Sequence, residues 1–298
     1  MKYFTVRGED RCLNAATRSV LCGSFITLSD GVTHYRLSGP QCGELVVLVG
    51  GLTVPLFYWD QVTQYLHRAG RRTLAYSSYG RGYSERVKHT YNEHLFVRQL
   101  TELVQTLGLN GQHHVVAASM GALTAMQYVS ENAACVASLT LAGPAGLAPR
   151  PQALRWLMSS DYLARFVARH LGRGWLKRHE TNDLGDRTRA PELAAMLRDA
   201  YRYEGSLHAI FDTLQNFRLF DRAPLYRAVG ELHLPILLVW GQHDRVTSID
   251  KLGVAQTLLK PQQCHVKGCG HMVPFERPQA LVEHITSFIG RPRKRNAL

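Results

Sequence analysis

The chain has 298 residues, of which 45% are hydrophobic and 19% charged. This length and composition predict a globular protein with a sizeable core, built as one large domain or as one domain with an insertion. The first residues lack the apolar segment of a secretory signal, and no uncharged stretch is long enough to cross a bilayer. We therefore expect neither a secreted nor a membrane-spanning protein, but a cytoplasmic one.

The formal net charge is +12, and four of the positive charges lie in the last eight residues, RPRKRNAL. The other basic residues are spread singly along the chain without aromatic residues at regular spacing, so nucleic-acid binding is not expected. The six cysteines form no CxxC pair, which argues against a zinc site and against a disulfide framework. We expect no metal and no cofactor.

From residue 24 onward, short apolar runs alternate with longer amphipathic ones, as in strands covered by helices. The runs 24–30 and 33–39 flank the turn signal Asp30-Gly31 and are expected to pair antiparallel. Residues 45–51 are a Val- and Leu-rich run closed by two glycines, which is typical of a fully buried strand.

Helices and strands then alternate regularly. The pattern predicts a mostly parallel, doubly wound α/β sheet. The expected helices cover residues 55–70, 93–111 and 121–132, and the expected strands cover residues 72–78, 113–119 and 136–146.

The alternation stops after Gly146. Residues 150–224 have helical spacing throughout and are rich in Leu, Trp, Tyr and Phe, so we interpret them as a helical cap inserted between two core strands. The sheet resumes with strands over 234–244 and 262–271, each followed by a helix. The predicted organisation is an N-terminal extension (1–23), a core (24–149 and 225–290), the cap (150–224) and a basic tail (291–298).

Ser119 stands where a buried strand ends and a helix begins, between Ala117 and Gly121. A serine at such a turn adopts a strained backbone that exposes its Oγ at the edge of the sheet, and small neighbours let the strand and the helix approach each other. The turn also points the Met120 N–H at a group above the serine. A serine that only caps a helix would fit this local pattern as well.

Two later strand ends supply the partners that a nucleophilic serine needs. Asp244 follows one buried strand and His271 follows the last strand, so both are expected at the sheet edge where Ser119 lies. A histidine takes the proton of the serine, and a carboxylate orients the histidine. The chain order Ser, Asp, His belongs to one particular fold.

Other residues near these positions are expected to have ordinary roles. We interpret His243 and His265 as surface or structural histidines, because neither lies in the Gly-rich loop after a strand. Glu276 is expected to be a solvated carboxylate at a helix start. Cys269 has no partner at ligand spacing and is expected to be a plain thiol.

Several motifs in order resemble the α/β-hydrolase superfamily, from about residue 24 to residue 290. They are Gly50-Gly51, SYGRGYSER, AASMGA, WGQHD and GCGHMVPFERP. The chain is most similar to the monoacylglycerol lipase and lysophospholipase-like carboxylesterases of this superfamily.

The resemblance implies a role for each motif residue. Ser119 would be the nucleophile, His271 the general base and then the general acid, and Asp244 the residue that orients His271. The backbone N–H groups of Leu52 and Met120 would form the oxyanion hole. The resemblance implies a serine esterase with a lipase-like cap.

Two positions depart from the pattern of the superfamily. Gly50 stands where a histidine is usual, and Ser77 stands where an aspartate is usual. Both lie in loops near the expected oxyanion hole. We expect these departures to make the oxyanion loop less rigid and the activity reduced or specialised.

The apolar cap favours an ester of a fatty or aromatic acid, hydrolysed through an acyl-enzyme. The substrate-binding residues are expected to be Gly51, Trp156, Phe211 and Phe217. Arginines of the cap leave open an ester carried on an acidic acyl carrier protein, and peripheral contact with a membrane is also open. Two further alternatives are a carbon–carbon bond hydrolase with the same triad and a catalytically silent binding protein of the same fold.

Overall fold

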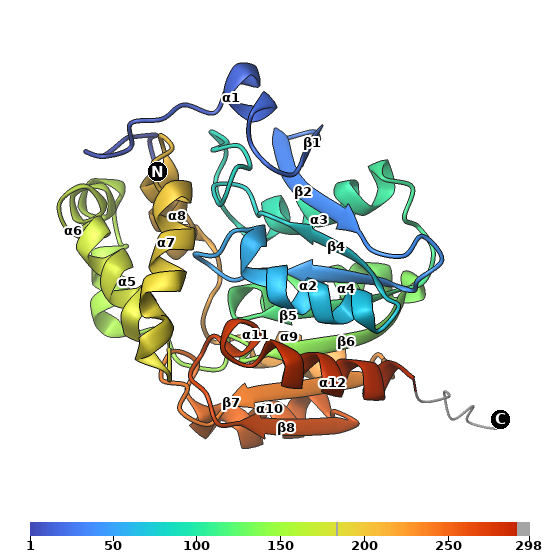
Figure 1. Ribbon diagram of the computed structural model, residues 1–298. Helices are drawn as coiled ribbons and strands as arrows, with labels where there is room; N and C mark the ends of the chain where they lie inside the picture. Colours follow the sequence, from blue (N-terminus) through green and yellow to red (C-terminus); the bar gives the residue numbers. More distant parts are fainter. Residues whose placement is uncertain (183, 291–298) are drawn as a thin grey trace.

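The computed structural model describes residues 1–182 and 184–290 (Figure 1). In this part of the chain, eight strands form one sheet in the order β1-β2-β4-β3-β5-β6-β7-β8. The strands are β1 (Ser24–Thr27), β2 (Val32–Ser38), β3 (Leu45–Val49), β4 (Arg72–Tyr76), β5 (His113–Ala118), β6 (Val136–Ala142), β7 (Ile236–Gly241) and β8 (Gln263–Lys267).

The pairing of the strands follows the sequence pattern. β1 and β2 are antiparallel and are joined by a turn at Asp30-Gly31, and β2 also pairs antiparallel with β4. The pairs from β4 through β3, β5, β6 and β7 to β8 are parallel. Residues 45–49 and 113–118 are buried throughout, as expected for strands that helices cover on both faces. The doubly wound α/β fold is confirmed.

The helices of the core form two layers (Figure 1). Helix α2 (Asp60–Arg68) packs against α12 (Pro278–Ile289), with the short α11 (Val273–Glu276) beside them. On the opposite face, contacts run from α3 to α4, from α4 to α9 and from α9 to α10. The bounds of this second layer are α3 (Glu93–Thr106), α4 (Met120–Asn132), α9 (Ala223–Gly230) and α10 (Leu252–Leu259).

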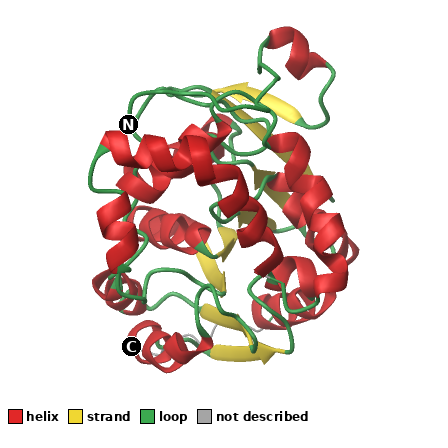
Figure 2. Cartoon of the chain, turned by 90° about the vertical axis from the view of Figure 1, so that its left-hand side faces the viewer, coloured by secondary structure: helices red, strands yellow, loops and turns green. Residues whose placement is uncertain are grey.

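A group of helices between β6 and β7 lies at the edge of the sheet to which the parallel strands point (Figure 1). Figure 2 looks onto this group, whose helices cross in front of the strand ends. We call it the cap, and α9, which follows it, packs on the core instead. The helices of the cap are α5 (Gln152–Leu157), α6 (Asp161–Asn182), α7 (Ala190–Ala200) and α8 (Ser206–Asn216).

Residues near the start of the chain pack on the cap. Phe4 is buried, and the carboxylate of Glu9 accepts hydrogen bonds from the backbone N–H groups of Gly205 and Leu207, at 3.0 and 2.8 Å. Gly205 has a φ of 82°, a left-handed conformation that suits glycine at the start of α8. The segment expected to be an extension therefore contacts the beginning of α8.

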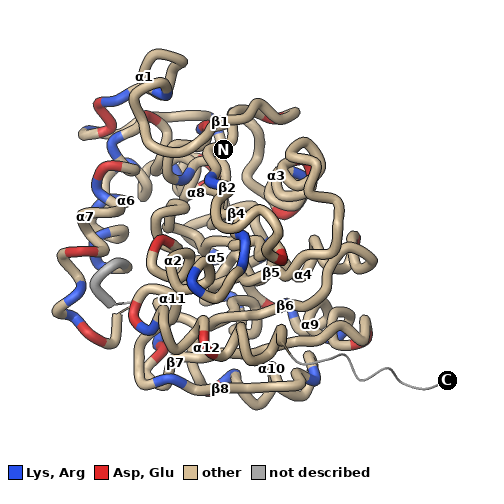
Figure 3. Tube along the Cα trace, turned by 45° about the vertical axis from the view of Figure 1, so that its right-hand side comes forward, with Lys and Arg blue, Asp and Glu red and all other residues tan. Residues whose placement is uncertain are grey.

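The charged residues do not gather on one face of the fold, and Lys and Arg are found in both the cap and the core (Figure 3). Helix α6 carries Arg165, Arg169 and Arg173 together with the exposed aromatic residues Tyr162 and Phe166. Among the described residues, no helix combines the length and apolar character that a membrane span requires.

Candidate active site

Ser119 occupies a strained turn between β5 and α4, with φ 54° and ψ −124°. Few residues other than glycine adopt a positive φ. The turn is held by hydrogen bonds from the Ser119 N–H to the Ala142 carbonyl and from the Ala145 N–H to the Ser119 carbonyl, each 3.1 Å long. A Cβ at Gly121 would collide with the carbonyls at the end of β3. The small residue expected at this position is therefore required by the packing of α4.

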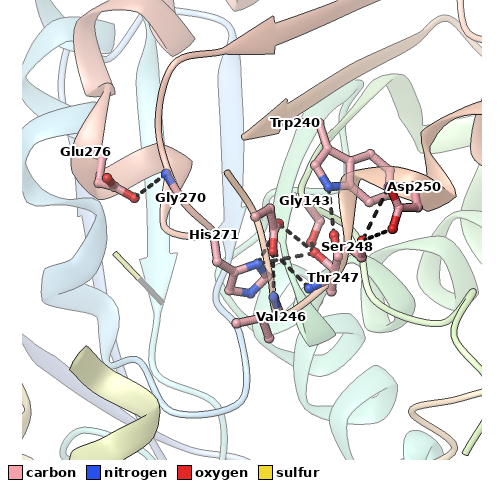
Figure 4. A network of polar contacts seen from close by, with 10 residues as sticks. Gly143, Trp240, Val246, Thr247, Ser248, Asp250, Gly270, His271 and Glu276 are labelled. Carbon is pink, nitrogen blue, oxygen red and sulfur yellow. Dashed lines mark hydrogen bonds and ion pairs between the residues drawn. The ribbon is translucent and has the colours of Figure 1, made fainter. Parts of the chain in front are cut away.

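His271 and Asp244 lie together at the same edge of the sheet. The Nδ1 of His271 is 2.8 Å from the Oδ2 of Asp244, and both residues are buried. The imidazole of His271 points into a cluster of polar groups (Figure 4). With its Nδ1–H donated to the carboxylate, the imidazole keeps Nε2 as the nitrogen that can exchange a proton with another group. Ser119 and His271 line one small pocket.

The Asp244 carboxylate has further hydrogen-bond partners that the sequence pattern did not reveal. Its Oδ1 accepts the backbone N–H groups of Val246 and Thr247, each at 2.9 Å. The Thr247 hydroxyl lies 2.8 Å from Oδ2 and 3.0 Å from the Gly143 carbonyl oxygen (Figure 4). A hydroxyl has one proton, so it donates to one of these two acceptors at a time. A Cβ on Gly143 would lie 3.0 Å from Oδ2. Gly143 therefore leaves room for the Asp244 carboxylate, and Thr247 orients it.

Two hollows meet at Ser119. The small pocket has a volume of about 20 Å³, and the larger cavity beside it has a volume of about 290 Å³. Leu52, Ser119 and His179 line both. Met120 also lines the larger cavity and is the first residue of α4, so its N–H has no acceptor within the helix. Both residues expected to form the oxyanion hole thus lie beside Ser119.

The loop after β3, residues 50–56, is held by three side chains. The Leu56 N–H donates to Ser77 Oγ at 3.0 Å, the Tyr201 hydroxyl donates to the Thr53 carbonyl at 2.7 Å, and Arg81 Nε donates to the Leu52 carbonyl at 2.8 Å. The expectation of a less rigid loop stays a prediction, and these hydrogen bonds show which side chains support the loop. Ser77 itself supports the loop, and two residues from other segments replace the side chain that Gly50 lacks.

Arg81 joins this loop to the cap. Its guanidinium is fully buried, and Nη2 donates to the Thr213 hydroxyl of α8 at 2.8 Å. Burial lowers the pKa of Arg81 to about 10, which leaves it protonated at neutral pH. A positive charge is thus fixed at the carbonyl of Leu52. The sequence signal for Arg81 was its place in SYGRGYSER, but spacing alone assigned it no role.

Glu276 ties the His271 loop to the cap. Its Oε1 accepts the Gly270 N–H at 3.0 Å, and its Oε2 accepts the N–H groups of Gly185 and Asp186 at 2.9 and 3.0 Å (Figure 4 shows the first of these bonds). The side chain is buried, so the prediction of a solvated carboxylate was wrong. The cause is the cap, whose backbone approaches the start of α11 from a distant part of the sequence. Arg189 of the cap also donates to the Phe275 carbonyl.

The cap residues expected to bind substrate lie elsewhere. Trp156 is 64% exposed, Phe211 packs against Trp175 with ring centroids 5.7 Å apart, and Phe217 packs against Phe96 at 5.7 Å. None of the three expected residues lines either hollow. Gly51 does line the small pocket, where a Cβ would lie 3.1 Å from that of Ser119.

The wall of the larger cavity is apolar but comes from other residues. Leu154 and Trp156 are two positions apart on α5 and therefore point to opposite sides of the helix. Leu154 faces the cavity and Trp156 does not. The large apolar residues of the wall are Leu147, Leu154, Trp175, Leu214, Leu219, Phe220 and Trp240.

His179, near the end of α6, brings a second imidazole to the site. Its ring stacks on Trp175 with centroids 5.0 Å apart and an interplanar angle of 13°. Burial, together with the nearby His271, lowers the pKa of His179 to about 4, so the ring is neutral at pH 7. Sequence reasoning missed this residue because its approach to Ser119 depends on how the cap docks.

The remaining candidate residues are not at the site. His243 is exposed, and His265 stacks on His284 with centroids 3.8 Å apart. Burial raises the pKa of the Cys269 thiol to about 12, which keeps it protonated. Among the side chains that the structure describes, which leave out residues 180–183 and 291–298, His, Cys, Asp and Glu form no group of three or more that could hold a metal ion.

The sheet, the turn at Ser119 and the Asp244–His271 pair together define the class of α/β hydrolases. The sequence profile of the alpha/beta hydrolase fold matches residues 44–278, and the chain belongs to this family.

Characterised relatives are distant. A 2-hydroxy-6-oxononadienedioate/2-hydroxy-6-oxononatrienedioate hydrolase of Cupriavidus pinatubonensis is 25% identical over 286 residues, covering 89% of this chain and 94% of the relative. Monoacylglycerol lipase abhd6-B of Xenopus laevis is 26% identical over 219 residues, covering 65% of this chain and 59% of the relative.

Solved structures share the fold at low sequence identity. The enol-lactonase from Burkholderia xenovorans LB400 superposes with a TM-score of 0.76 at 19% identity, covering 90% of this chain and 100% of that chain. An esterase from Exiguobacterium antarcticum also has a TM-score of 0.76, at 18% identity, covering 91% and 100% of the two chains.

Proposed function

We propose that this α/β hydrolase is a serine esterase that cleaves carboxylic esters with an apolar acyl group. One observation carries the proposal: Ser119, in a strained turn, shares a pocket with His271, whose Nδ1 lies 2.8 Å from Asp244. This is the arrangement that makes a serine hydroxyl nucleophilic, because the histidine can take the hydroxyl proton.

The reaction follows from these positions. His271 Nε2 accepts the proton of Ser119 Oγ as Oγ attacks the ester carbonyl carbon. The N–H groups of Leu52 and Met120 donate to the resulting oxyanion. When the intermediate collapses, His271 returns the proton to the departing alcohol oxygen. A water then gives a proton to His271 and attacks the acyl-enzyme, releasing the acid and Ser119.

The larger cavity supports an apolar acyl group. Its wall is made mostly of aliphatic and aromatic side chains, and at about 290 Å³ it lies near the lower end of small-molecule pockets, which span about 300–1,000 Å³. A short or medium acyl chain suits this volume better than a long one. The similarity to monoacylglycerol lipases also supports an ester as the substrate class.

A second candidate is carbon–carbon bond hydrolysis, favoured by the relative whose match covers most of both chains. The named substrates of that relative are dicarboxylates. Lys251 lines the larger cavity and offers one cation for a carboxylate. A dicarboxylate has two anionic ends, and the described wall offers no second Lys or Arg, so we favour the ester.

Labelling with a fluorophosphonate probe tests the nucleophile. Wild-type protein should be labelled, and Ser119→Ala should not. Ser130→Ala is the matched control, because Ser130 is an exposed serine of the same helix, α4. Equal labelling of Ser119→Ala and wild type would contradict the proposal.

A substrate panel separates the two candidates. Methyl octanoate, monooctanoylglycerol and a 2-hydroxy-6-oxo-dienoate should be offered at equal concentration, with product acids measured by chromatography. Cleavage of either ester supports the esterase. Cleavage of the dienoate alone would replace the proposal with the second candidate.

A further inference from the structure

The two hollows at Ser119 differ in which catalytic residue they contain. Leu52, Ser119 and His179 line both, so the reacting carbonyl carbon, bonded to Ser119 Oγ, sits at their junction. His271 lines the small pocket and is absent from the wall of the larger cavity. The junction therefore divides a bound ester into two parts with different surroundings.

The position of His271 determines which cavity holds the alcohol and which holds the acyl group of the ester. The alcohol oxygen of the ester must receive its proton from His271 Nε2, so the alcohol lies on the side of the small pocket. The acyl group then extends into the larger, apolar cavity. This assignment rests on the proposed esterase function.

The small pocket is narrow and firmly walled. Thr53, Val54, Tyr58 and Met272 line it, and each is at most 5% exposed. Its volume of about 20 Å³ is many times smaller than the volume of about 290 Å³ of the larger cavity. A methoxy group places the least bulk in this small pocket, whereas a butoxy or glyceryl group needs more of the room that the larger cavity has and the small pocket lacks.

We propose that the preferred substrates are esters of very small alcohols, above all methyl esters of apolar acids, and that His179 of the cap sets this limit. In the first step, the Ser119 Oγ–acyl bond forms and the acyl–methoxy bond breaks, and methanol leaves with the proton from His271. A water of similar size then fills the vacated pocket beside His271. One compartment thus serves the leaving alcohol and the hydrolytic water in turn.

His179 suits the role of a dividing wall. It comes from the cap, its ring stacks flat on Trp175, and it faces both hollows. A low pKa, caused by burial and by His271, keeps the ring uncharged beside an apolar acyl group at neutral pH. Truncation of this ring would join the two hollows and give the alcohol more room.

The test varies the alcohol while the acyl group stays constant. The kcat/KM values of methyl, ethyl, propyl and butyl octanoate are measured by release of octanoic acid. We expect about a tenfold fall for each added methylene, the lower end of the effect of one methylene in a hydrophobic pocket. In His179→Ala, and independently in Val54→Ala, the ratio of butyl to methyl activity should rise at least about tenfold.

Leu214→Ala is the matched control, because Leu214 lines the larger cavity and not the small pocket. It should leave the butyl-to-methyl ratio unchanged and alter the preference among methyl esters of different acids. Equal activity towards methyl and butyl octanoate in the wild type would overturn the inference while leaving the esterase intact. The proposed function itself fails in a different way, when no ester is cleaved and Ser119 is not labelled.

Discussion

The core and the cap meet at Ser119 but hold their residues in different ways. The core fixes His271 by a buried hydrogen bond to Asp244 across the ends of β8 and β7, and Thr247 holds Asp244 within its own loop. The cap contributes Trp175 and Leu214 as apolar walls and reaches the catalytic loops through a few polar contacts. The core thus supplies the candidate triad, and the cap supplies part of the wall around it.

The polar contacts between the two regions are placed at both catalytic loops. Arg81 joins the Leu52 carbonyl to Thr213 of the cap, and Glu276 joins the Gly270 N–H to the Gly185 N–H of the cap. Each is a buried charged group, and a hydrogen bond to a charged group contributes more than one between neutral groups. The division between core and cap is therefore testable by removing one contact at a time.

The largest effect is expected within the core, from Asp244→Asn. An amide in place of the carboxylate can present an N–H to His271 Nδ1 and favour the wrong tautomer of the imidazole. We expect kcat to fall by about 10⁴-fold while the circular dichroism spectrum is unchanged. Activity within tenfold of the wild type would remove Asp244 from the catalytic set.

Arg81→Met should have the next largest effect, because it leaves the Leu52 carbonyl without its donor. Arg81 does not touch the substrate in this mechanism and acts as a positioning residue for the oxyanion loop. We expect kcat to fall by about 10–100-fold with little change in KM, less than the loss of an oxyanion donor itself. Arg81→Lys should restore part of kcat.

Thr213→Val separates the two roles of Arg81, since it removes the cap contact and leaves the bond to Leu52. It should cost less in kcat than Arg81→Met. A KM effect alone in Arg81→Met would show that the residue serves substrate binding and not the position of the loop.

Glu276→Gln should mainly affect how the cap is attached. An amide has one oxygen and cannot accept the N–H groups of Gly270, Gly185 and Asp186 in the present arrangement. We expect a loss of about 1–3 kcal/mol in the free energy of unfolding, measured by urea denaturation. Stability equal to that of the wild type would mean that the cap does not depend on this contact.

Mild acid should also destabilise the fold, and the effect should differ between the regions. Burial lowers the pKa of His34 in the core, and of His179 and His208 in the cap, to about 4 from an ordinary 6.5. Between these pH values the unfolded chain binds protons that the folded chain does not, so stability is lost as the pH falls from about 6.5 towards 4.

Hydrogen exchange at pH 7 and pH 5, corrected for intrinsic rates, measures where the loss occurs. Two of the three histidines with a pKa of about 4 lie in the cap, so amides of α6 and α8 should lose protection before those of β3, which contains no histidine. Equal loss of protection in both regions would contradict the idea that the cap is the part more sensitive to acid.

The sequence by itself was enough for the sheet and for the position of the candidate triad. Buried strands are continuous apolar runs, and helices repeat every 3.6 residues, so both can be recognised locally. Ser119, Asp244 and His271 each follow such a run directly. Because parallel strands end at one edge of the sheet, strand order and strand ends predict that these residues meet.

The surroundings of these three residues depend on contacts between distant segments. The rotation of α5 about its axis turns Leu154 towards the cavity and Trp156 towards solvent. The docking of the cap buries Glu276 and brings His179 beside Ser119. The contact of Glu276 with Gly185 joins segments about ninety residues apart. Composition cannot rank one apolar cap residue above another. The residues of the candidate triad can thus be predicted from local patterns, whereas the walls around them depend on packing between distant segments.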